Sequence, residues 1–422
     1  MGTDVDGMPR KAEQIPTVGL NRTSTVQSYN NDRLGFLHEM ARSHGPVVQL
    51  WPGTLMVTGP QEVHAVLKNT NRKFAKDRDL RLKKSKDTPG SQNLADWMST
   101  RRTVVTGMTA QSLDEHAVWL SSEADQVADR MLRRHRVDDV TATLEQVTSR
   151  SIARFCFGSR DATAVPVAAQ AMLDALFPIF SSPYEFPPYL KLLQPREWRA
   201  GRRIRAMHDV LLSTATGAGE GGLVDLLYDS GLDDAAVVDA LTSVLLAAHW
   251  VPAAATAWAL VELARDRTEQ EAARRAALAW RPFQPEPPEL GWVVDETLRL
   301  WPPSWITDRA VDDAVVCGSW TLPPRSRVVL PFWVIHRLAD CYPDPSTFRS
   351  RRWEDLTPPP GAYVPFGGGP RRCLGARFAR TEIITLLAVL LRRLSFRLEG
   401  QVRPDARNTL GPAGFSLVAE PC

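Results

Sequence analysis

The sequence predicts a mainly α-helical protein with small β-sheets, built as one large domain over residues 1–422. Apolar residues recur at helical spacing through most of the chain between residues 60 and 279. Runs that alternate apolar and polar residues are short and lie near the two ends of the chain. The stretches rich in proline and glycine are short enough to be loops within one domain rather than linkers between domains.

The first expected elements are a helix and a hairpin. Residues 1–15 are polar and mixed in charge, and we expect a flexible tail there. Asp32 to His44 has the pattern of a short amphipathic helix. The alternating segments Val47–Trp51 and Thr54–Thr58 flank the two-residue turn Pro52-Gly53, which predicts a β-hairpin.

The long helical region after Pro60 is interrupted by segments rich in proline, glycine or aromatic residues. These segments are Ser181–Pro188, Gly217–Gly222 and Pro282–Pro288. The next helix is expected from Glu289 to Leu300. It must end there, because prolines follow and proline cannot continue the helical hydrogen bonding.

The C-terminal part mixes strands, loops and one strong helix. Short strands are expected near Val315–Thr321 and Arg327–Leu330. A long irregular stretch, Tyr342 to Gly369, precedes a helix from Leu374 to Leu391. The remaining residues predict a small β region that turns at Gly411–Gly414.

Bulk composition excludes several classes of protein. A net charge of +3 in 422 residues gives no reason to expect nucleic acid as a partner. The N-terminus lacks a secretory signal, and no apolar run reaches the ~18 residues of a membrane span, so we expect a cytoplasmic protein without a membrane anchor. The five cysteines are odd in number and lack CxxC or zinc spacing, which argues against a disulfide framework.

One cysteine, Cys373, lies in unusual surroundings. Residues 366–375 read Phe-Gly-Gly-Gly-Pro-Arg-Arg-Cys-Leu-Gly. The glycines allow the backbone to approach a large flat group, and Pro370 stiffens the turn. The start of the following helix and the nearby Arg371 both favour a thiolate. A core cysteine after a glycine turn is the alternative, and a nucleophile would need a histidine base that is not placed locally.

This run resembles the haem-binding loop of the cytochrome P450 family, Phe-x-x-Gly-x-Arg-x-Cys-x-Gly. It matches every fixed position, namely Phe366, Gly369, Arg371, Cys373 and Gly375. The resemblance extends from about residue 30 to the C-terminus. It implies the cytochrome P450 fold, haem b (iron protoporphyrin IX) as cofactor, and Cys373 as the thiolate ligand to the iron.

The resemblance also implies residues that hold the haem propionates, which need cationic or hydrogen-bonding partners. Trp97 and Arg101 match the family's Trp-x-x-x-Arg pair. Arg309, after the Pro302-Pro303 loop, matches a third contact, and Arg371 matches a fourth. Each of these residues taken alone would more often be a surface residue.

A structural motif of the family is matched as well. Glu296 and Arg299 share one helix face and resemble the family's Glu-x-x-Arg pair, although a surface ion pair is the alternative. In the family a downstream arginine closes the pair, and Arg352 is the matching residue. Two usual residues of that downstream motif, a proline and a glutamate, are Ser350 and Arg351 here.

The central helix departs from the family pattern Ala-Gly-x-Asp/Glu-Thr-Thr/Ser. Ala248 replaces the glycine, Trp250 the acid, Val251 the threonine and Pro252 the next alcohol. In the family the acid and the threonine deliver protons for dioxygen cleavage. Indole N–H can only donate a hydrogen bond and valine has no polar atom, so neither replaces them. Pro252 predicts a kink.

Several explanations for this departure stay open. The alignment can be slipped, with Thr256 or Thr242 as the alcohol. His249 can supply a proton, although it occupies a variable position of the family and a packing role is the alternative. Otherwise the substrate supplies the hydroxyl and water, or the protein does not activate oxygen in the usual way.

The resemblance implies a haem-thiolate oxidoreductase, and we favour a monooxygenase that oxidises a small apolar molecule in natural-product biosynthesis. Oxygen activation would then be assisted by the substrate. The alternatives are an isomerase, dehydratase, peroxygenase or coupling enzyme on the same fold, or a haem-binding sensor. The expected partners are the substrate and a ferredoxin with its reductase, and the protein is expected to be a monomer.

The substrate pocket is also carried over from the family. Trp250, Val251 and Pro252 would shape its floor beside the iron. The residues expected to line it are Ser304, Trp305, Ile306, Thr307 and Phe415, with the segments Phe177–Tyr189 and Pro412–Phe415.

Overall fold

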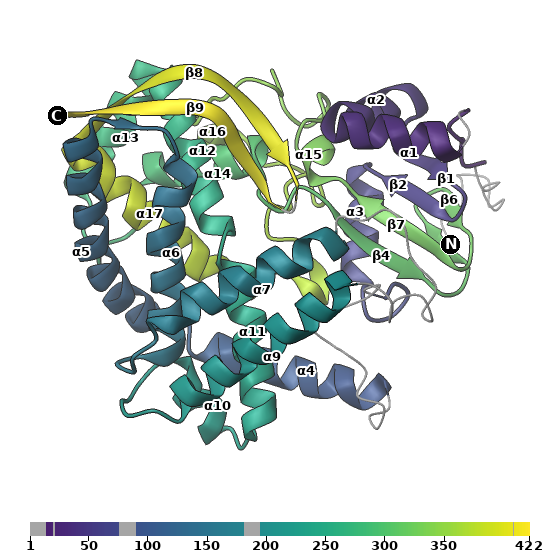
Figure 1. Cartoon of the computed structure of the whole chain (residues 1–422). Helices are drawn as coiled ribbons and strands as arrows, with labels where there is room; N and C mark the ends of the chain where they lie inside the picture. The colour runs from purple at the N-terminus through teal and green to yellow at the C-terminus, as the bar shows by residue number, and fades with distance from the viewer. Residues whose placement is uncertain (1–13, 20–21, 76–89, 181–194, 408) are drawn as a thin grey trace. The chain divides into compact units, whose positions relative to one another are not determined.

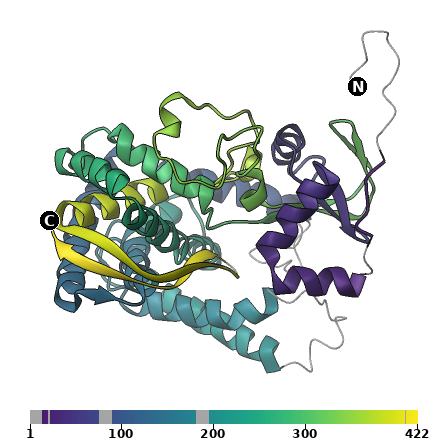
Figure 2. The same ribbon diagram turned by 90° about the horizontal axis from the view of Figure 1, so that it is seen from above.

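The computed structural model describes residues 14–19, 22–75, 90–180, 195–407 and 409–422. The chain divides into two compact units (Figures 1 and 2). The first contains Met1–Asp79, Leu298–Phe348 and Trp353–Cys373. The second contains Leu80–Thr297, Arg349–Arg352 and Leu374–Cys422.

The first unit is built on a four-stranded sheet with the order β1-β2-β7-β4. Its strands are β1 (Val47–Trp51), β2 (Thr54–Val57), β7 (Ser326–Leu330) and β4 (Thr307–Val311). β1 and β2 form the expected hairpin, with Val47 opposite Val57, whereas β7 runs parallel to β2. All four residues of β2 are buried, as expected of a strand in the middle of a sheet.

Helices and a second hairpin complete this unit. They are α1 (Arg22–Asn31), α2 (Arg33–His44), α3 (Pro60–Lys68), α15 (Phe332–Ile335), the 3₁₀ turn η1 (Gly369–Arg371) and the strands β5 (Val315–Cys317) and β6 (Trp320–Leu322). The Asp32 side chain caps α2 by accepting a hydrogen bond from the N–H of Gly35 at 3.0 Å. The helix expected over Asp32–His44 is thereby confirmed. α16 (Arg352–Asp355) starts at the boundary between the units.

The second unit is mostly helical. Its helices are α4 (Gly90–Thr106), α5 (Ala110–Arg134), α6 (Val140–Phe157), α7 (Ala164–Phe180), α9 (Pro195–Ala215), α10 (Leu223–Asp229), α11 (Asp234–Ala248), α12 (Val251–Arg265), α13 (Arg267–Ala279), α14 (Pro288–Leu300) and α17 (Ala376–Arg393). A sheet of order β3-β9-β8 joins β3 (Arg136–Val137), β9 (Leu410–Pro421) and β8 (Leu394–Ala406). The β8–β9 hairpin lies along the helices of this unit (Figure 1).

The core of the second unit is centred on α12, whose residues from Pro252 to Leu263 are all buried. A helix that is buried on every side is apolar all round, which explains its alanine-rich sequence. The indole N–H of Trp258 donates to the carbonyl of Leu410 at 3.1 Å, so this buried polar group is satisfied. The expectation that no apolar run reaches the length of a membrane span is wrong for Asp234–Arg265, which is long and apolar enough to cross a membrane. However, 67% of its apolar window is buried, as in a core helix.

Several expected boundaries are confirmed and others are wrong. The interruptions at Gly217–Gly222 and Pro282–Pro288 separate α9 from α10 and α13 from α14, whereas Ser181–Pro188 lies outside the described residues. The turn predicted at Gly411–Gly414 is wrong, because Gly411, Pro412 and Ala413 pair with β8 inside β9, and Gly414 lies at the irregularity that follows. Gly414 has φ +79°, so the glycine serves an irregularity within a strand rather than a chain reversal.

A buried carboxyl group in α17 makes the stability of the fold depend on pH. Glu382 is 1% exposed, and neither of its oxygens has a hydrogen bond of good geometry, although the hydroxyl of Ser151 lowers its pKa slightly. Burial raises the pKa of Glu382 to about 8. The folded protein therefore keeps this proton at pH 7, where the unfolded chain has lost it.

We therefore expect Glu382 to destabilise the fold progressively as the pH rises from about 5 to about 8. Glu382→Gln removes the ionisation. Relative to the wild type, the variant should gain about 2 kcal/mol or more in free energy of unfolding between these pH values. Urea denaturation at both pH values measures this gain, and Glu115→Gln, at an exposed site, is the control. Identical pH dependence of the wild type and Glu382→Gln would contradict the assignment.

Candidate functional site

The cysteine loop in the first unit is held by backbone hydrogen bonds. The N–H of Cys373 donates to the carbonyl of Phe366 at 2.8 Å, which closes the loop. The N–H of Gly367 donates to the carbonyl of Val364 at 2.9 Å, and η1 forms the middle of the loop. Cys373 follows η1 at the end of this loop, and it is exposed. The loop therefore presents its thiol on a backbone that is fixed in place.

Gly369 is required by the backbone and by a neighbouring helix. Its φ is +62°, in the left-handed region that favours glycine. A Cβ atom at this position would lie 2.0 Å from the carbonyl oxygen of Leu67 in α3. Gly367 also has a positive φ, +67°, but faces open space. Gly369 therefore lies closely against α3, which is a reason for this glycine that the sequence did not indicate.

Three of the other thiols are buried or partly buried. Burial raises the pKa of Cys156 strongly and raises that of Cys317 to about 12. Cys341 is partly buried, and its pKa is also raised. Cys422 is exposed but stands at the end of the chain. Thus Cys373 is the exposed cysteine that lies within a structured loop of the described chain.

The helix after Cys373 begins slightly later than the sequence predicted. The helix expected from Leu374 begins at Ala376, with Gly375 as its N-cap. Cys373 therefore precedes the N-cap by two residues and is not part of the first helical turn. The helix dipole therefore stabilises a thiolate at Cys373 less than it would within the first turn, because the effect of the dipole falls off with distance from the helix end.

Two arginines of the first unit converge on one turn. Arg309 in β4 donates from Nε to the hydroxyl of Thr70 at 2.9 Å, and Arg371 donates from Nε to Oδ1 of Asn71 at 3.0 Å. Thr70 and Asn71 directly follow α3, and the bridge between Ala75 and Ala310 ties this turn to β4. Sequence reasoning missed both anchors, because nothing local marks a Thr-Asn pair as a partner for distant arginines.

The electrostatics of this arginine pair favour an anion. Arg309 is 4% exposed, and burial lowers its pKa to about 10. The nearby Asp308 carboxylate raises this pKa, whereas the positive charge of Arg371 lowers it further. Two guanidinium groups that repel each other in a partly buried place are stabilised by an anion that both can contact.

The second pair expected at the site lies on α4 in the second unit. Trp97 and Arg101 are four residues apart, so their backbone positions share one face of the helix. Arg101 is partly buried. The side chain of Trp97 lies outside the described residues.

The central helix of the second unit is broken at the position that the sequence indicated. α11 ends at Ala248 and α12 begins at Val251, with Pro252 in its first turn. His249 and Trp250 form the break. The hydroxyl of Thr148 in α6 donates to the carbonyl of His249 at 3.3 Å. A neighbouring helix therefore satisfies a carbonyl at the break.

Gln170 in α7 fastens both residues of the break. Its Oε1 accepts a hydrogen bond from Nε1 of Trp250 at 3.1 Å and lies 2.9 Å from Nε2 of His249. Its Nε2 donates to Asp174 at 2.8 Å, which fixes the orientation of the amide. Sequence reasoning missed Gln170, although a polar residue within the apolar segment Ala164–Phe180 was a usable signal.

Burial makes His249 a poor proton donor at neutral pH. It is 4% exposed, and burial lowers its pKa to about 4, while Asp174 opposes this shift. The ring is thus neutral near pH 7 and donates its Nε2 proton to Gln170. Glu145 lies in α6, and burial together with the charges of Asp139 and Asp174 raises its pKa to about 7.

Neither alcohol of a slipped alignment is available near the break. Thr242 donates its hydroxyl proton to the carbonyl of Val238 at 2.7 Å, and Thr256 donates to that of Pro252 at 2.9 Å. Both are buried, and both bonds stay within the residue's own helix. A hydroxyl that is bonded in this way serves the backbone of its helix.

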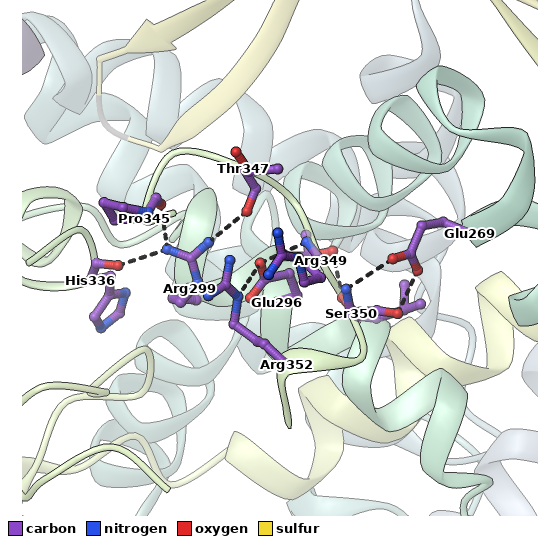
Figure 3. A network of polar contacts seen from close by, with 11 residues as sticks. Glu269, Glu296, Arg299, His336, Pro345, Thr347, Arg349, Ser350 and Arg352 are labelled. Carbon is purple, nitrogen blue, oxygen red and sulfur yellow. Dashed lines mark hydrogen bonds and ion pairs between the residues drawn. The ribbon is translucent and has the colours of Figure 1, made fainter. Parts of the chain in front are cut away.

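A buried ion pair organises the end of α14 in the second unit. Arg352 donates from Nε to Oε1 of Glu296 at 2.8 Å, and the backbone N–H of Arg349 donates to the same oxygen at 2.9 Å (Figure 3). The carboxylate of Glu296 is fully buried. Ser350, where the family motif has proline, donates from its N–H and hydroxyl to Glu269.

Arg299 belongs to the first unit and binds carbonyl groups there. Its Nη1 donates to the carbonyls of His336 at 2.9 Å and Pro345 at 2.7 Å, and its Nη2 donates to Thr347 at 3.3 Å (Figure 3). Its guanidinium carbon lies 5.1 Å from the ring centre of Tyr342. Arg299 is thus a structural residue that holds the segment leading to the cysteine loop.

The residues expected to line a substrate pocket differ in exposure. Trp305 is 2% exposed and packs as a core residue, whereas Ser304 is exposed. Ile306 and Thr307 are partly exposed, and Thr307 opens β4. Phe415 is buried in β9, opposite Gly400. The segment Phe177–Tyr189 lies outside the described residues after Phe180.

The comparisons with known proteins agree on one family. The family model for cytochrome P450 matches residues 13–421. The protein described as cytochrome P450 137 of Mycobacterium tuberculosis is 34% identical over 199 residues, which is 47% of this chain and 39% of that relative. Cyclooctatin synthase of Streptomyces melanosporofaciens is 33% identical over 205 residues, which is 45% of this chain and 44% of that relative.

Longer matches extend the comparison. The protein described as cytochrome P450 139 of Mycobacterium bovis is 28% identical over 335 residues, covering 73% of this chain and 76% of that relative. The crystal structure of the haem domain of cytochrome P450DA aligns with a TM-score of 0.79 and 18% identity, and the alignment covers 98% of each chain. The matched segments span only about two fifths of the first two relatives named above.

The close approach of Gly369 to α3 can be tested by substitution. Gly369→Ala places a Cβ against the Leu67 carbonyl and strains a left-handed φ, so the free energy of unfolding should fall by about 2 kcal/mol or more. Gly411→Ala, at a site with no atom within 4 Å of the added Cβ, is the control. Urea denaturation of both variants measures the difference. Equal stability of the two variants would show that the contact with α3 does not constrain the loop.

Proposed function

Because the chain belongs to the cytochrome P450 family, its cofactor is haem with a cysteine thiolate ligand, and we propose that Cys373 is that ligand in a monooxygenase of small apolar molecules. The observation that carries the proposal is the exposed Cys373 at the end of a loop fixed by backbone hydrogen bonds. The thiols of Cys156, Cys317 and Cys341 are buried or partly buried, and their raised pKa values disfavour the thiolate.

The residues of the first unit fit haem. Haem carries two carboxylates, and Arg309 with Arg371 forms a pair of cations that an anion would stabilise. Thr70 and Asn71 hold the two guanidinium groups in place. Trp97 and Arg101 are proposed as further contacts from α4, and Ala248, Phe366 and Gly375 as residues beside the ring.

Bound haem would supply an iron centre whose thiolate ligand donates electron density that favours cleavage of the O–O bond. The chain's own contribution near α12 is unusual. Trp250 donates its indole proton to Gln170, His249 is neutral, and both nearby threonines bond to their own helices. We therefore assign proton delivery to a hydroxyl or bound water that the substrate brings.

The substrate class and the redox partner follow from the family. Cyclooctatin synthase supports natural-product biosynthesis as the setting, and the pocket is assigned to Ile306, Thr307 and the segment Pro412–Phe415. Members of the family draw electrons from ferredoxin-type donors, and we assign such a donor to this chain. A second candidate is a reaction of the same fold that needs no proton delivery, such as isomerisation or dehydration. This second candidate is favoured by the hydroxyl groups of Thr242 and Thr256, which donate to carbonyls of their own helices.

The ligand assignment is tested by spectroscopy. The reduced protein with carbon monoxide should show the long-wavelength Soret band of thiolate ligation. Cys373→Ser should lose this band, because serine does not supply a thiolate. Cys156→Ser, Cys317→Ser, Cys341→Ser and Cys422→Ser should keep it. Retention of the band in Cys373→Ser would reject the assignment.

The arginine pair is tested by haem retention. Loss of a charge-assisted hydrogen bond typically costs about 1.5–3 kcal/mol, or roughly 10- to 100-fold in affinity. Arg309→Ala and Arg371→Ala should therefore lower the haem content of the purified protein. Arg275→Ala, at an exposed site on α13, is the control. The same haem content in all three variants would show that the pair does not anchor the cofactor.

The two candidate reactions are separated by their need for oxygen. A monooxygenase assisted by its substrate requires oxygen and an electron donor. A substrate analogue that lacks the hydroxyl should bind but divert electrons to hydrogen peroxide. Trp250→Asp with Val251→Thr should then restore oxidation of the analogue, to the extent that Pro252 allows. Product formation without oxygen and without a donor would instead establish the redox-neutral reaction.

A further inference from the structure

A hollow in the second unit lies between the end of α5 and the start of α6, which run side by side (Figure 1). Its empty volume is about 270 Å³, and this volume includes the open mouth. Two buried apolar side chains, Met131 and Val137, line it. The other residues that line it are polar, namely Arg130, Arg134, Thr143 and Gln146. A ligand without polar groups would leave these side chains without water or partners, so the hollow suits a polar ligand.

The hollow is strongly positive. Neither Arg130 nor Arg134 forms an ion pair or a hydrogen bond through its side chain in the part of the chain that the structure describes. Burial lowers the pKa of Arg130, and the positive charges of three neighbouring arginines lower it further, namely Arg150, Arg133 and Arg134. The carboxylate of Glu123 opposes this shift. Four arginines and one glutamate give a local charge of +3, which equals the charge of the whole chain.

The carboxylates that lie near the hollow along the chain have other partners. Glu123 forms an ion pair with Arg150 at 2.6 Å. Asp138 forms one with Arg136 at 2.8 Å. Asp139 caps the start of α6, where its side chain accepts a hydrogen bond at 2.8 Å from a backbone N–H of the first turn. None of these three carboxylates is bonded to the two arginines that line the hollow.

The fold explains only part of this cluster of cations. Cations in the last turn of a helix stabilise it, because the helix dipole is negative at that end. This accounts for Arg133 and Arg134, which lie in the last turn of α5. It does not account for Arg130, which lies a turn earlier and is half-buried beside like charges. A guanidinium group in such a place is stabilised when an anion joins it.

We propose that the hollow binds a phosphate group between Arg130 and Arg134. These residues stand at i and i+4 on α5, so both guanidinium groups can donate to the oxygens of one tetrahedral anion. A phosphate monoester carries about two negative charges and three acceptor oxygens, which matches two cations better than a single carboxylate does. The side-chain amide of Gln146, which has no hydrogen bond within the described chain, supplies a further donor. Thr143 is a wall of the hollow, because its hydroxyl already donates to a backbone carbonyl at 2.8 Å.

The hollow takes the phosphate end of a ligand and leaves the rest of it in the open mouth. Inorganic phosphate and a small phosphate ester both present this end, so they are the two sources to be distinguished. This binding is independent of the proposed reaction, because Arg309 and Arg371, which are assigned to haem, lie in the first unit. Haem content and the carbon monoxide spectrum report on the proposed function, whereas phosphate affinity reports on the hollow.

The test is calorimetric titration of the full-length haem protein at about pH 7.5, where phosphate is mostly a dianion. Inorganic phosphate and glycerol 3-phosphate are titrated separately, and each should bind at one site, at least about tenfold more tightly than acetate. Tighter binding of glycerol 3-phosphate supports a phosphate ester as the natural ligand, and equal affinities support free phosphate. Arg130→Gln combined with Arg134→Gln should weaken binding by about 30-fold. Arg134→Gln alone, at an exposed position where folding is not at risk, should weaken it about fivefold.

The control removes the same charge from elsewhere in the same unit. Arg275→Gln combined with Arg403→Gln alters two exposed arginines on α13 and β8, and should leave the phosphate affinity within about twofold of the wild type. Equal losses in the two double variants would overturn the proposal, because only net charge would then matter. Unchanged affinity in Arg134→Gln and in the variant of both lining arginines would also overturn it. So would acetate that binds as tightly as phosphate.

Discussion

The buried guanidinium group of Arg299 is the interaction on which the cysteine loop depends. A buried cation costs several kcal/mol unless polar groups surround it, and here three backbone carbonyls and the face of Tyr342 do so. Each carbonyl belongs to an irregular stretch that has no ladder hydrogen bonds of its own. The cation thus gives an irregular segment a single conformation, and the segment in turn satisfies the cation.

This constraint continues to the loop through two residues. Arg299 holds the carbonyl of His336, whose Nε2 accepts a hydrogen bond from the N–H of Val364 at 2.9 Å. Burial lowers the pKa of His336 to about 3, so the ring is neutral and can accept this bond. The carbonyl of Val364 then accepts from Gly367, inside the loop. The position of the thiol is therefore set by a buried charge far from it in the sequence.

The sequence predicted what depends on local chemistry. The hairpin at residues 47–58, the helix that ends at Leu300 and the break beside Pro252 follow from turn residues, proline and periodicity, and all are present. The anchors of the two arginines, Thr70 and Asn71, could not be predicted, because they are ordinary residues brought near by the fold. The turn predicted at Gly414 is wrong because a glycine permits a positive φ in a strand as readily as in a turn.

The break in the central helix is a structural feature with partners of its own. A helix that loses hydrogen bonds at a proline is destabilised by about 3 kcal/mol or more unless other groups satisfy its backbone. Here the hydroxyl of Thr148 in α6 donates to the carbonyl of His249, and Gln170 in α7 binds the side chains of His249 and Trp250. Because Gln170 accepts a hydrogen bond from the indole N–H of Trp250, the one polar atom of that side chain is engaged within the chain. These polar groups therefore hold the break together, which is the reason that we propose proton delivery by the substrate.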